Sequence, residues 1–188
     1  MKSTAPDFIY KEYVSKPVCK NLIKFFKKSS DKAPGVVGAG KLIPEIKTSV
    51  DIGLDVLNPV LQPYLKEVAK ILEKYKRLYR FCDRNHGTYR VQERISLQCY
   101  EPGQAYFSWH PDRCGKKIRE GGDRHLSFMT YLNTVKQGGK TEWFYQKVSV
   151  SPKEGLTIMW PVGWTHAHRG TIAPRETKYI ITGWYNFV

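Results

Sequence analysis

The 188-residue sequence lacks any apolar run of about 18 residues, so it predicts no membrane-spanning helix. Its N-terminus, "MKSTAPDFIYKEY", lacks the apolar core of a secretory signal peptide. Its four cysteines lie far apart without a CxxC pair, which predicts reduced thiols rather than a disulfide framework. The chain also has no internal repeat and no low-complexity tract. We therefore expect a cytoplasmic protein without a membrane partner.

Acidic residues are scarce beside basic ones: 31 Lys and Arg stand against 17 Asp and Glu, a formal charge of +14. A field of this size favours acidic partners such as nucleic acid or an acidic peptide, and it is also compatible with a surface that is merely well solvated. Because the lysines are spread along the chain, the case for nucleic acid is the weaker one. The length and the 41% hydrophobic content predict one domain, residues 1–188, with a full core.

The N-terminal part predicts two helices. The first lies within residues 15–29, with Ser15 as a candidate N-cap and Pro17 in the first turn. The second covers about residues 59–81, and a Gly- and Pro-rich loop at 33–44 separates the two. The apolar positions recur at helical spacing in both: Val18, Leu22, Phe25 and Phe26 in the first, and Leu61, Leu65, Val68, Leu72, Tyr75 and Leu78 in the second.

The residue composition changes after about residue 88. Short runs rich in Val, Ile, Thr and aromatic residues follow one another, separated by Gly and Pro. These runs occupy residues 88–100, 124–135, 140–152, 155–161 and 177–188. They predict antiparallel strands that close into a sandwich or roll. The predicted fold class is therefore α+β with a mostly β core: a helical support region over residues 1–85 packs on a β core over 86–188.

The stretch "YFSWHPDRCG" places His110 and Asp112 two residues apart. On an extended strand both side chains would point to the same face. Two imidazoles and one carboxylate leave metal positions open for a cosubstrate and oxygen, which suits non-haem Fe(II). "GWTHAHRG" offers His166 and His168 as the third ligand. An isolated HxD in a solvent-exposed turn is the alternative.

A family resemblance decides between the two histidines. In "HRGTIAPRETKYIITGWY", His168 lies ten residues before Lys178, and Trp184 closes the last β-prone run. From about residue 90 to 188 the sequence resembles the Fe(II)/2-oxoglutarate-dependent oxygenases of the prolyl 4-hydroxylase type, whose pattern has a Lys or Arg ten residues after the metal histidine. Counting from His166 would put Glu176 at that position, which is wrong for binding a dicarboxylate. The resemblance therefore implies His110, Asp112 and His168 as catalytic metal ligands, with His166 near them or near the substrate.

The same resemblance implies a double-stranded β-helix, also called a jelly roll or cupin-like fold. Lys178 would pair with the distal carboxylate of 2-oxoglutarate, and Arg175 is a fallback for that task. Tyr131 and Tyr100 match positions at which the family places tyrosines around the cosubstrate. The "QGGKTEWF" segment matches a Gly–Gly turn of architectural value.

The implied activity is that of a dioxygenase: 2-oxoglutarate and O2 give succinate and CO2 while a substrate C–H bond is hydroxylated. Peptidyl proline is the first substrate the resemblance indicates, and ascorbate is a further cofactor it suggests. Substrate loops are expected at residues 33–44 and 112–125, both of them basic, which is consistent with an acidic peptide.

Two rival functions use the same features differently. A nucleic-acid-binding protein would owe its function to the positive charge and would bind in a salt-dependent way without a metal. A nucleobase-modifying oxygenase would keep the iron but anchor 2-oxoglutarate with arginines placed later in the chain. The cation at Lys178, ten residues after His168, argues against the second rival.

Overall fold

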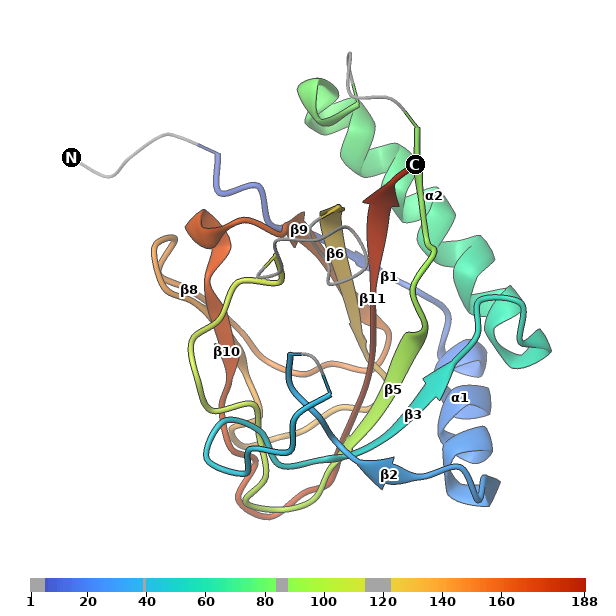
Figure 1. Ribbon diagram of the computed structural model, residues 1–188, viewed down its shortest axis with the longest axis vertical. Coiled ribbons are helices and arrows are strands. Elements are labelled where there is room, and N and C mark those ends of the chain that lie inside the picture. Colours follow the sequence, from blue (N-terminus) through green and yellow to red (C-terminus); the bar gives the residue numbers. More distant parts are fainter. Residues whose placement is uncertain (1–5, 39, 84–87, 114–122) are drawn as a thin grey trace.

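The computed structural model describes residues 6–38, 40–83, 88–113 and 123–188. They form two antiparallel β-sheets and two long helices (Figure 1). The strands are β1 (Tyr10–Tyr13), β2 (Ala33–Pro34), β3 (Val50–Leu54), β4 (Tyr89–Arg90), β5 (Ile95–Tyr100), β6 (Arg124–Tyr131), β7 (Thr141–Trp143), β8 (Val148–Val150), β9 (Leu156–Pro161), β10 (His168–Gly170) and β11 (Lys178–Phe187). The larger sheet has the order β1-β9-β6-β11-β5-β3-β2, with β4 beside β11, and the smaller has the order β10-β7-β8.

Both predicted helices are present. Helix α1 (Lys16–Lys28) has Pro17 in its first turn, where the missing N–H is not needed. Helix α2 (Gln62–Leu78) lies between two 3-10 turns, Pro59–Leu61 and Arg80–Cys82, which together account for the predicted length. The helices lie on the outer face of the larger sheet, away from the smaller sheet (Figure 1). No helix among the described residues is long and apolar enough to span a membrane.

Ser15 precedes α1 as predicted, but its side chain makes no capping hydrogen bond. Its hydroxyl instead donates to the carboxylate of Glu67 on α2, at 2.7 Å, and its backbone N–H donates to the same carboxylate at 2.6 Å. The start of α1 is therefore fixed by a contact to the second helix rather than by a local cap, a contact that sequence spacing does not reveal.

The core has two parts. The larger part lies between the helices and the larger sheet, and includes Leu22, Val68, Leu97 and Ile181 from both halves of the chain. The smaller part lies between the two sheets and is rich in large side chains: Ile9, Met129, Tyr131, Trp143, Val150, Leu156, Ile158 and Trp160. The space between the sheets is thus closed by apolar packing on one side, which leaves the other side for a site.

The sequence predicts a helical support region over residues 1–85, and the structure contains strands there as well as the two helices. Strand β1 pairs with β9 at one edge of the larger sheet, and β3 pairs with β5 near the other. Both strands are short, and charged residues interrupt them (Lys11 and Glu12 in β1, Asp51 in β3), so that tertiary pairing rather than composition determines them. The N-terminal region therefore extends the sheet as well as supporting it.

The HxD segment differs from prediction in a similar way. His110 forms a single antiparallel bridge with His168, and the two backbones exchange N–H···O bonds of 3.0 Å in both directions. Asp112 lies beyond this bridge, outside any strand. Backbone pairing thus brings the two histidines together directly, although the segment is not the regular strand that period-two alternation suggests. Most of the loop predicted at 112–125, residues 114–122, lies outside the described residues.

Candidate active site

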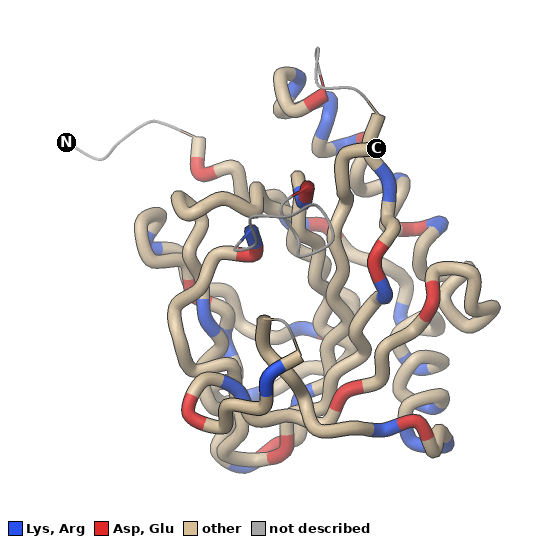
Figure 2. The backbone as a smooth tube through the Cα atoms, in the orientation of Figure 1, with Lys and Arg blue, Asp and Glu red and all other residues tan. Residues whose placement is uncertain are grey.

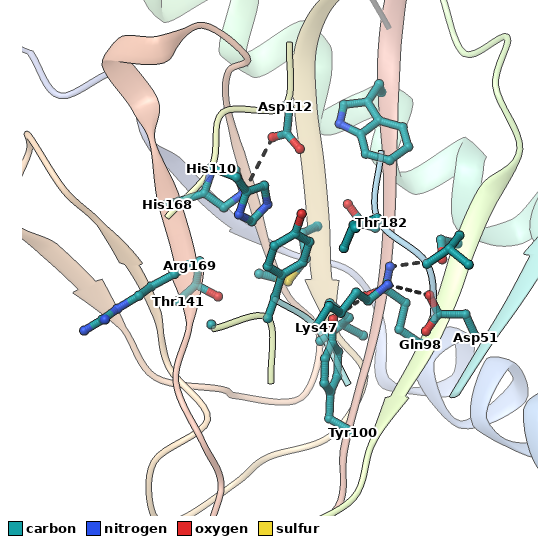
Figure 3. A pocket seen from close by; sticks show the side chains of 18 of the residues that line it. Lys47, Asp51, Gln98, Tyr100, His110, Asp112, Thr141, His168, Arg169 and Thr182 are labelled. Carbon is teal, nitrogen blue, oxygen red and sulfur yellow. Dashed lines mark hydrogen bonds and ion pairs between the residues drawn. The ribbon is translucent and has the colours of Figure 1, made fainter. Parts of the chain in front are cut away.

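Three predicted side chains meet in one place. Each of them offers one potential ligand atom, and these three atoms, from His110, Asp112 and His168, all lie within 4.8 Å of one another. The Nε2 atom of His168 is 3.6 Å from Oδ2 of Asp112, and the two imidazole centroids are 4.4 Å apart. All three residues line a cavity of about 440 Å³ between the sheets (Figure 3). The predicted cluster therefore exists, and it opens to a space large enough for a small molecule.

Hydrogen bonds to carbonyl oxygens orient both imidazoles. Nδ1 of His110 is 3.0 Å from the carbonyl oxygen of Ser108, and Nδ1 of His168 is 3.0 Å from that of His166. A carbonyl only accepts, so each Nδ1 carries the proton and each Nε2 keeps its lone pair. The ring of Tyr106 stacks on His110 with centroids 3.7 Å apart, which limits rotation of that imidazole. Two unprotonated nitrogens are thus presented beside the Asp112 carboxylate.

The electrostatics of the cluster suit a divalent cation. Burial, reinforced by the neighbouring His168, lowers the pKa of His110 to about 4, so this imidazole is neutral at pH 7. Burial alone would raise the pKa of Asp112, but the two histidines and a hydrogen bond from Ser127 outweigh it, and that pKa is lowered. The Ser127 hydroxyl donates to Oδ2 of Asp112 at 2.5 Å. Two imidazole nitrogen donors and one anionic oxygen donor are a set that Fe(II) accepts.

A buried cation lies elsewhere in the cavity wall. Lys178 begins β11 and is only 3% exposed. Its ammonium donates to the carbonyl oxygen of Gly139 at 3.2 Å and lies 4.8 Å from the centroid of the Tyr100 ring. Among the described residues, no carboxylate lies within ion-pair distance of it. Burial lowers the pKa of Lys178 to about 8. The cavity thus holds a cation that an anionic ligand would compensate.

Both predicted tyrosines line the cavity, with their hydroxyls already bonded to the protein. The Tyr131 hydroxyl donates to the carbonyl oxygen of Val150 at 3.1 Å and accepts from Thr141 at 2.6 Å. The Tyr100 hydroxyl donates to the side-chain oxygen of Gln98 at 2.6 Å. A ligand would gain a hydrogen bond from either tyrosine only by replacing one of these partners.

The structure separates the other candidates from the cavity. His166 is tied by its Nε2 to the carbonyl oxygen of Asp7, at 3.0 Å, and lines a different groove. Arg175 is exposed and does not line the cavity. The Glu176 carboxylate accepts the backbone N–H of Lys136 at 2.7 Å, in a surface turn. The pair of His168 and Lys178, rather than of His166 and Glu176, faces the cavity.

Sequence reasoning missed two ion pairs in the cavity wall. The Lys47 ammonium is 2.6 Å from Asp51, and Arg124 is 2.5 Å from Glu93. The guanidinium of Arg124 also lies 3.6 Å from the centroid of the Trp184 ring. The acidic Asp51 inside the apolar run "VDIGL" was an available signal, because a charge in a strand interior needs a partner. The identity of the partner, however, depends on tertiary structure.

Part of the predicted loop at 33–44 also reaches the cavity. Val36, Val37, Gly38 and Gly40 line it, and the backbones of Val37 and Lys41 exchange hydrogen bonds of 2.8 and 2.9 Å. This short turn lies across the space between the sheets from β10 (Figure 1). The segment is therefore positioned to touch whatever occupies the cavity.

Comparison with known proteins accounts for this constellation. Residues 95–186, which include the cluster and Lys178, match the family model of the 2OG-Fe(II) oxygenase superfamily. Over this range the chain is similar to that superfamily. It is 25% identical, over 94% of its length and 68% of the relative's, to an Arabidopsis thaliana protein named "Probable prolyl 4-hydroxylase 3". The predicted resemblance to prolyl 4-hydroxylase-like oxygenases is thereby confirmed.

Solved structures share the fold of this oxygenase. A viral collagen prolyl hydroxylase from Paramecium Bursaria Chlorella virus-1, in complex with 2OG, matches with a TM-score of 0.72 at 23% identity, covering 97% of each chain. A prolyl hydroxylase from Trichoplax adhaerens, in complex with a hypoxia inducible factor peptide fragment, matches with a TM-score of 0.72 at 16% identity, covering 95% of this chain and 82% of that one. These matches confirm the predicted jelly roll.

The similarity to this superfamily and to the prolyl 4-hydroxylase relative indicates the chemistry of the protein. It is a prolyl hydroxylase-like enzyme, a dioxygenase that depends on Fe(II), 2-oxoglutarate and O2. The rival reading as a nucleic-acid-binding or nucleobase-modifying protein is not favoured.

Proposed function

We propose that this oxygenase hydroxylates peptidyl proline, with Fe(II) held by His110, Asp112 and His168. The observation that carries the proposal is the grouping of these three side chains, with ligand atoms within 4.8 Å of one another, in the same cavity as the ammonium of Lys178, which no described carboxylate pairs. The cluster offers the donors of a facial metal site, and Lys178 offers the charge that a dicarboxylate needs.

The residues around the cavity have separate tasks in this proposal. Bound Fe(II) and 2-oxoglutarate would supply the oxidative chemistry that consumes O2, releases succinate and CO2, and hydroxylates a carbon. The carbonyl oxygens of Ser108 and His166 keep both imidazoles in the metal-binding tautomer. Lys178 attracts the distal carboxylate of 2-oxoglutarate. Tyr131 and Tyr100 shape the wall around that carboxylate, and each can exchange its present hydrogen-bond partner for it.

The proposed substrate class rests on the relatives. The Arabidopsis protein carries the name of a prolyl 4-hydroxylase, the viral structure is that of a collagen prolyl hydroxylase, and the Trichoplax enzyme is in complex with a peptide fragment. A peptidyl proline is the substrate class that these three have in common. Four further statements stay predictions from the sequence: acidic character of the peptide, use of ascorbate, a cytoplasmic location, and division of one domain into a support region and a core.

The first experiment tests the metal and cosubstrate without turnover. Fe(II) and 2-oxoglutarate are added to the metal-free protein under anaerobic conditions, and the visible charge-transfer band of the chelated pair is recorded. We expect the band in the wild type, no band in His168→Ala, and a band that requires much more 2-oxoglutarate in Lys178→Ala. His166→Ala is the matched control, because this imidazole lies two residues away and outside the cluster; its band should match the wild type.

The second experiment tests the substrate. Proline-containing peptides are incubated aerobically with Fe(II), 2-oxoglutarate and ascorbate, and mass spectrometry detects the addition of one oxygen atom. We expect the added oxygen on proline, dependent on His168. A wild-type band together with 2-oxoglutarate turnover but no modified proline in any peptide would reject the substrate class while leaving the metal site in place.

A further inference from the structure

Exposed aromatic side chains are concentrated in one place. Of the seven exposed aromatic residues in the described part of the chain, four lie in a continuous row: Trp109 (38% exposed), Phe144 (43%), Tyr145 (57%) and Trp164 (70%). Their ring centroids follow one another at 5.2, 5.1 and 5.9 Å. We refer to these four residues as the aromatic strip. Contiguous exposed apolar surface of this kind marks interaction sites, since isolated exposed rings need no explanation and clustered ones do.

The aromatic strip is built on the segments that carry the candidate metal ligands. Trp109 directly precedes His110, and Trp164 begins the 3-10 turn Trp164–His166 that leads into β10. The N–H of Phe144 donates to the carbonyl oxygen of Ala167 at 2.9 Å, which ties the two ends together. None of the four residues lines the cavity, although Arg169, which lies against Trp109, does (Figure 3). The strip is therefore close to the candidate active site along the chain, but its surface lies outside the cavity.

The rings of the aromatic strip are perpendicular to one another. The interplanar angles are 82° between Trp109 and Phe144, 81° between Phe144 and Tyr145, and 86° between Tyr145 and Trp164. Perpendicular rings leave slots between neighbouring faces and edges. The steps between them are close to the rise of two residues in a polyproline II helix, about 6 Å. Aromatic-lined surfaces of this kind bind proline-rich segments, whose backbone is already ordered before binding.

The charges around the aromatic strip disfavour a nucleic acid. The guanidinium of Arg169 lies 4.6 Å from the Trp109 centroid but is paired with Glu142 at 3.1 Å. The ammonium of Lys147 lies 4.4 Å over the Phe144 ring. Successive bases need parallel ring faces and a track of free cations for their phosphates. The strip offers neither, because its rings are perpendicular and its arginine is neutralised.

We propose that the aromatic strip is a second binding site for the substrate chain, which holds a polyproline II segment of a proline-rich peptide outside the cavity. This inference rests on the proposed function, because it assigns to the oxygenase a substrate with several prolines rather than one. The segment held on the strip would raise the local concentration of neighbouring prolines at the cavity without touching the metal.

The test measures binding and turnover separately. A fluorescein-labelled decaproline peptide is titrated with the full chain, and anisotropy gives the Kd. Because exposed aromatic anchors dominate such interfaces, we expect Tyr145→Ala and Trp164→Ala each to weaken binding roughly five- to tenfold. Tyr13→Ala is the matched control, since Tyr13 is 54% exposed but lies on β1, outside the strip. Its Kd should equal that of the wild type.

Turnover distinguishes this inference from the proposed function. With a short peptide that contains one proline, the strip variants should keep the wild-type kcat/KM; with a long proline-rich peptide, their KM should rise by the same factor as the Kd. Decaproline binding that is equal in the strip variants and in Tyr13→Ala would overturn the inference. It would also be overturned if no protein bound decaproline while the strip variants lost binding of a single-stranded oligonucleotide. Loss of decaproline binding in the strip variants, in a wild type that hydroxylates no proline, would support the strip and reject the proposed function.

Discussion

At the scale of single residues, Lys178 lowers the stability of the fold for two reasons: it is almost fully buried, and no carboxylate of the described residues compensates its charge. Burial accordingly lowers its pKa from the ordinary 10.5 to about 8. Between these two values the unfolded chain binds more protons than the folded one. The contribution of Lys178 to the free energy of unfolding therefore rises as pH increases through this window, and it is least favourable below about pH 8.

The same pKa predicts how 2-oxoglutarate binding depends on pH. In the proposed role of Lys178 the dicarboxylate needs the protonated ammonium, and the free protein loses that proton above a pH of about 8. We expect the Kd for 2-oxoglutarate to be constant near pH 7 and to rise up to about tenfold per pH unit above pH 8. Anaerobic titrations of the visible band at pH 7, 8 and 9 measure this. Lys178→Arg is the control, because a guanidinium stays charged over this range and should give a flat profile; a flat wild-type profile would contradict the role of Lys178.

Ser127 offers a second prediction at this scale. Its hydroxyl donates to Oδ2 of Asp112 at 2.5 Å and fixes the carboxylate against the two imidazoles. Removing a hydrogen bond that orients a metal ligand typically costs about ten- to a hundredfold in metal affinity, and we expect Ser127→Ala to lose at least about tenfold. Anaerobic Fe(II) titration measures the loss. Ser96→Ala is the control: Ser96 also lines the cavity, but it bonds Gln98, and its removal should leave the Fe(II) affinity unchanged.

At the scale of elements, the turn before β7 has a strict requirement for glycine. Gly138 and Gly139 have φ of 72° and 63°, and a Cβ added to Gly138 would lie 2.1 Å from the carbonyl oxygen of Ile172. The turn also carries the Gly139 carbonyl that receives the Lys178 ammonium. Backbone strain and a clash with backbone therefore act together at this position.

We expect Gly138→Ala to lower the free energy of unfolding by more than about 2 kcal/mol, from left-handed strain plus displacement of the opposing backbone. Urea denaturation followed by circular dichroism measures the change. Gly163→Ala is the control, since its φ of −69° is ordinary and its added Cβ would meet only the Thr165 hydroxyl, at 3.9 Å. It should stay within about 1 kcal/mol of the wild type. Equal effects of the two substitutions would show that the turn is not constrained.

Elements with strong periodicity are predictable from the sequence, and those defined by their partners are not. Helix α2 carries five of the six predicted apolar positions, with Leu61 just before it, and β11 carries a long β-prone run, so each was identified within a few residues. Strand β1 is only four residues long and half polar; its identity comes from pairing with β9. Strand β10 is too short for any periodicity, and it exists because β7 lies beside it.

The residues of the candidate site likewise fall into those that the sequence predicts and those that only the fold brings together. His110 and Asp112 were found from their spacing in the HxD stretch, and His168 from the family resemblance, whose pattern places a cation ten residues after the metal histidine. Ser127 was not, because it lies fifteen residues from Asp112 in sequence and is joined to it only by the fold. Lys47 and Asp51 likewise come from the region assigned to helical support: Asp51 inside an apolar run indicates that a partner is needed, but no local pattern identifies Lys47 as that partner.

At the scale of the whole molecule, the formal charge of +14 is dispersed. Lys and Arg lie along both helices and around the smaller sheet, with Asp and Glu between them (Figure 2). A nucleic-acid-binding surface would instead gather cations into one track. The charge is thus better suited to solubility and to steering of anionic ligands, among them 2-oxoglutarate, than to a specific polyanion.

The shared core links the two halves of the chain. Leu22 of α1 and Val68 of α2 pack in one cluster with Leu97 of β5 and Ile181 of β11. Loss of either half would expose the apolar surface of the other, so we expect a single cooperative unfolding transition, observed at the same temperature by circular dichroism and by tryptophan fluorescence. Two separated transitions would contradict a single domain.

Ligands of the cavity should then stabilise the entire molecule, because they bind residues of both sheets and only when these are folded. At a ligand concentration of 100 times Kd the gain is about 2.7 kcal/mol, which for a chain of this length corresponds to roughly 5–10 °C in Tm. Anaerobic calorimetry with Mn(II), as a redox-inert substitute for Fe(II), plus 2-oxoglutarate measures the shift. His168→Ala should unfold without a shift, whereas His166→Ala, whose imidazole lies outside the cluster, should keep it. A shift that persists in His168→Ala would mean that the ligands bind elsewhere, and that the cluster of His110, Asp112 and His168 is not the metal site.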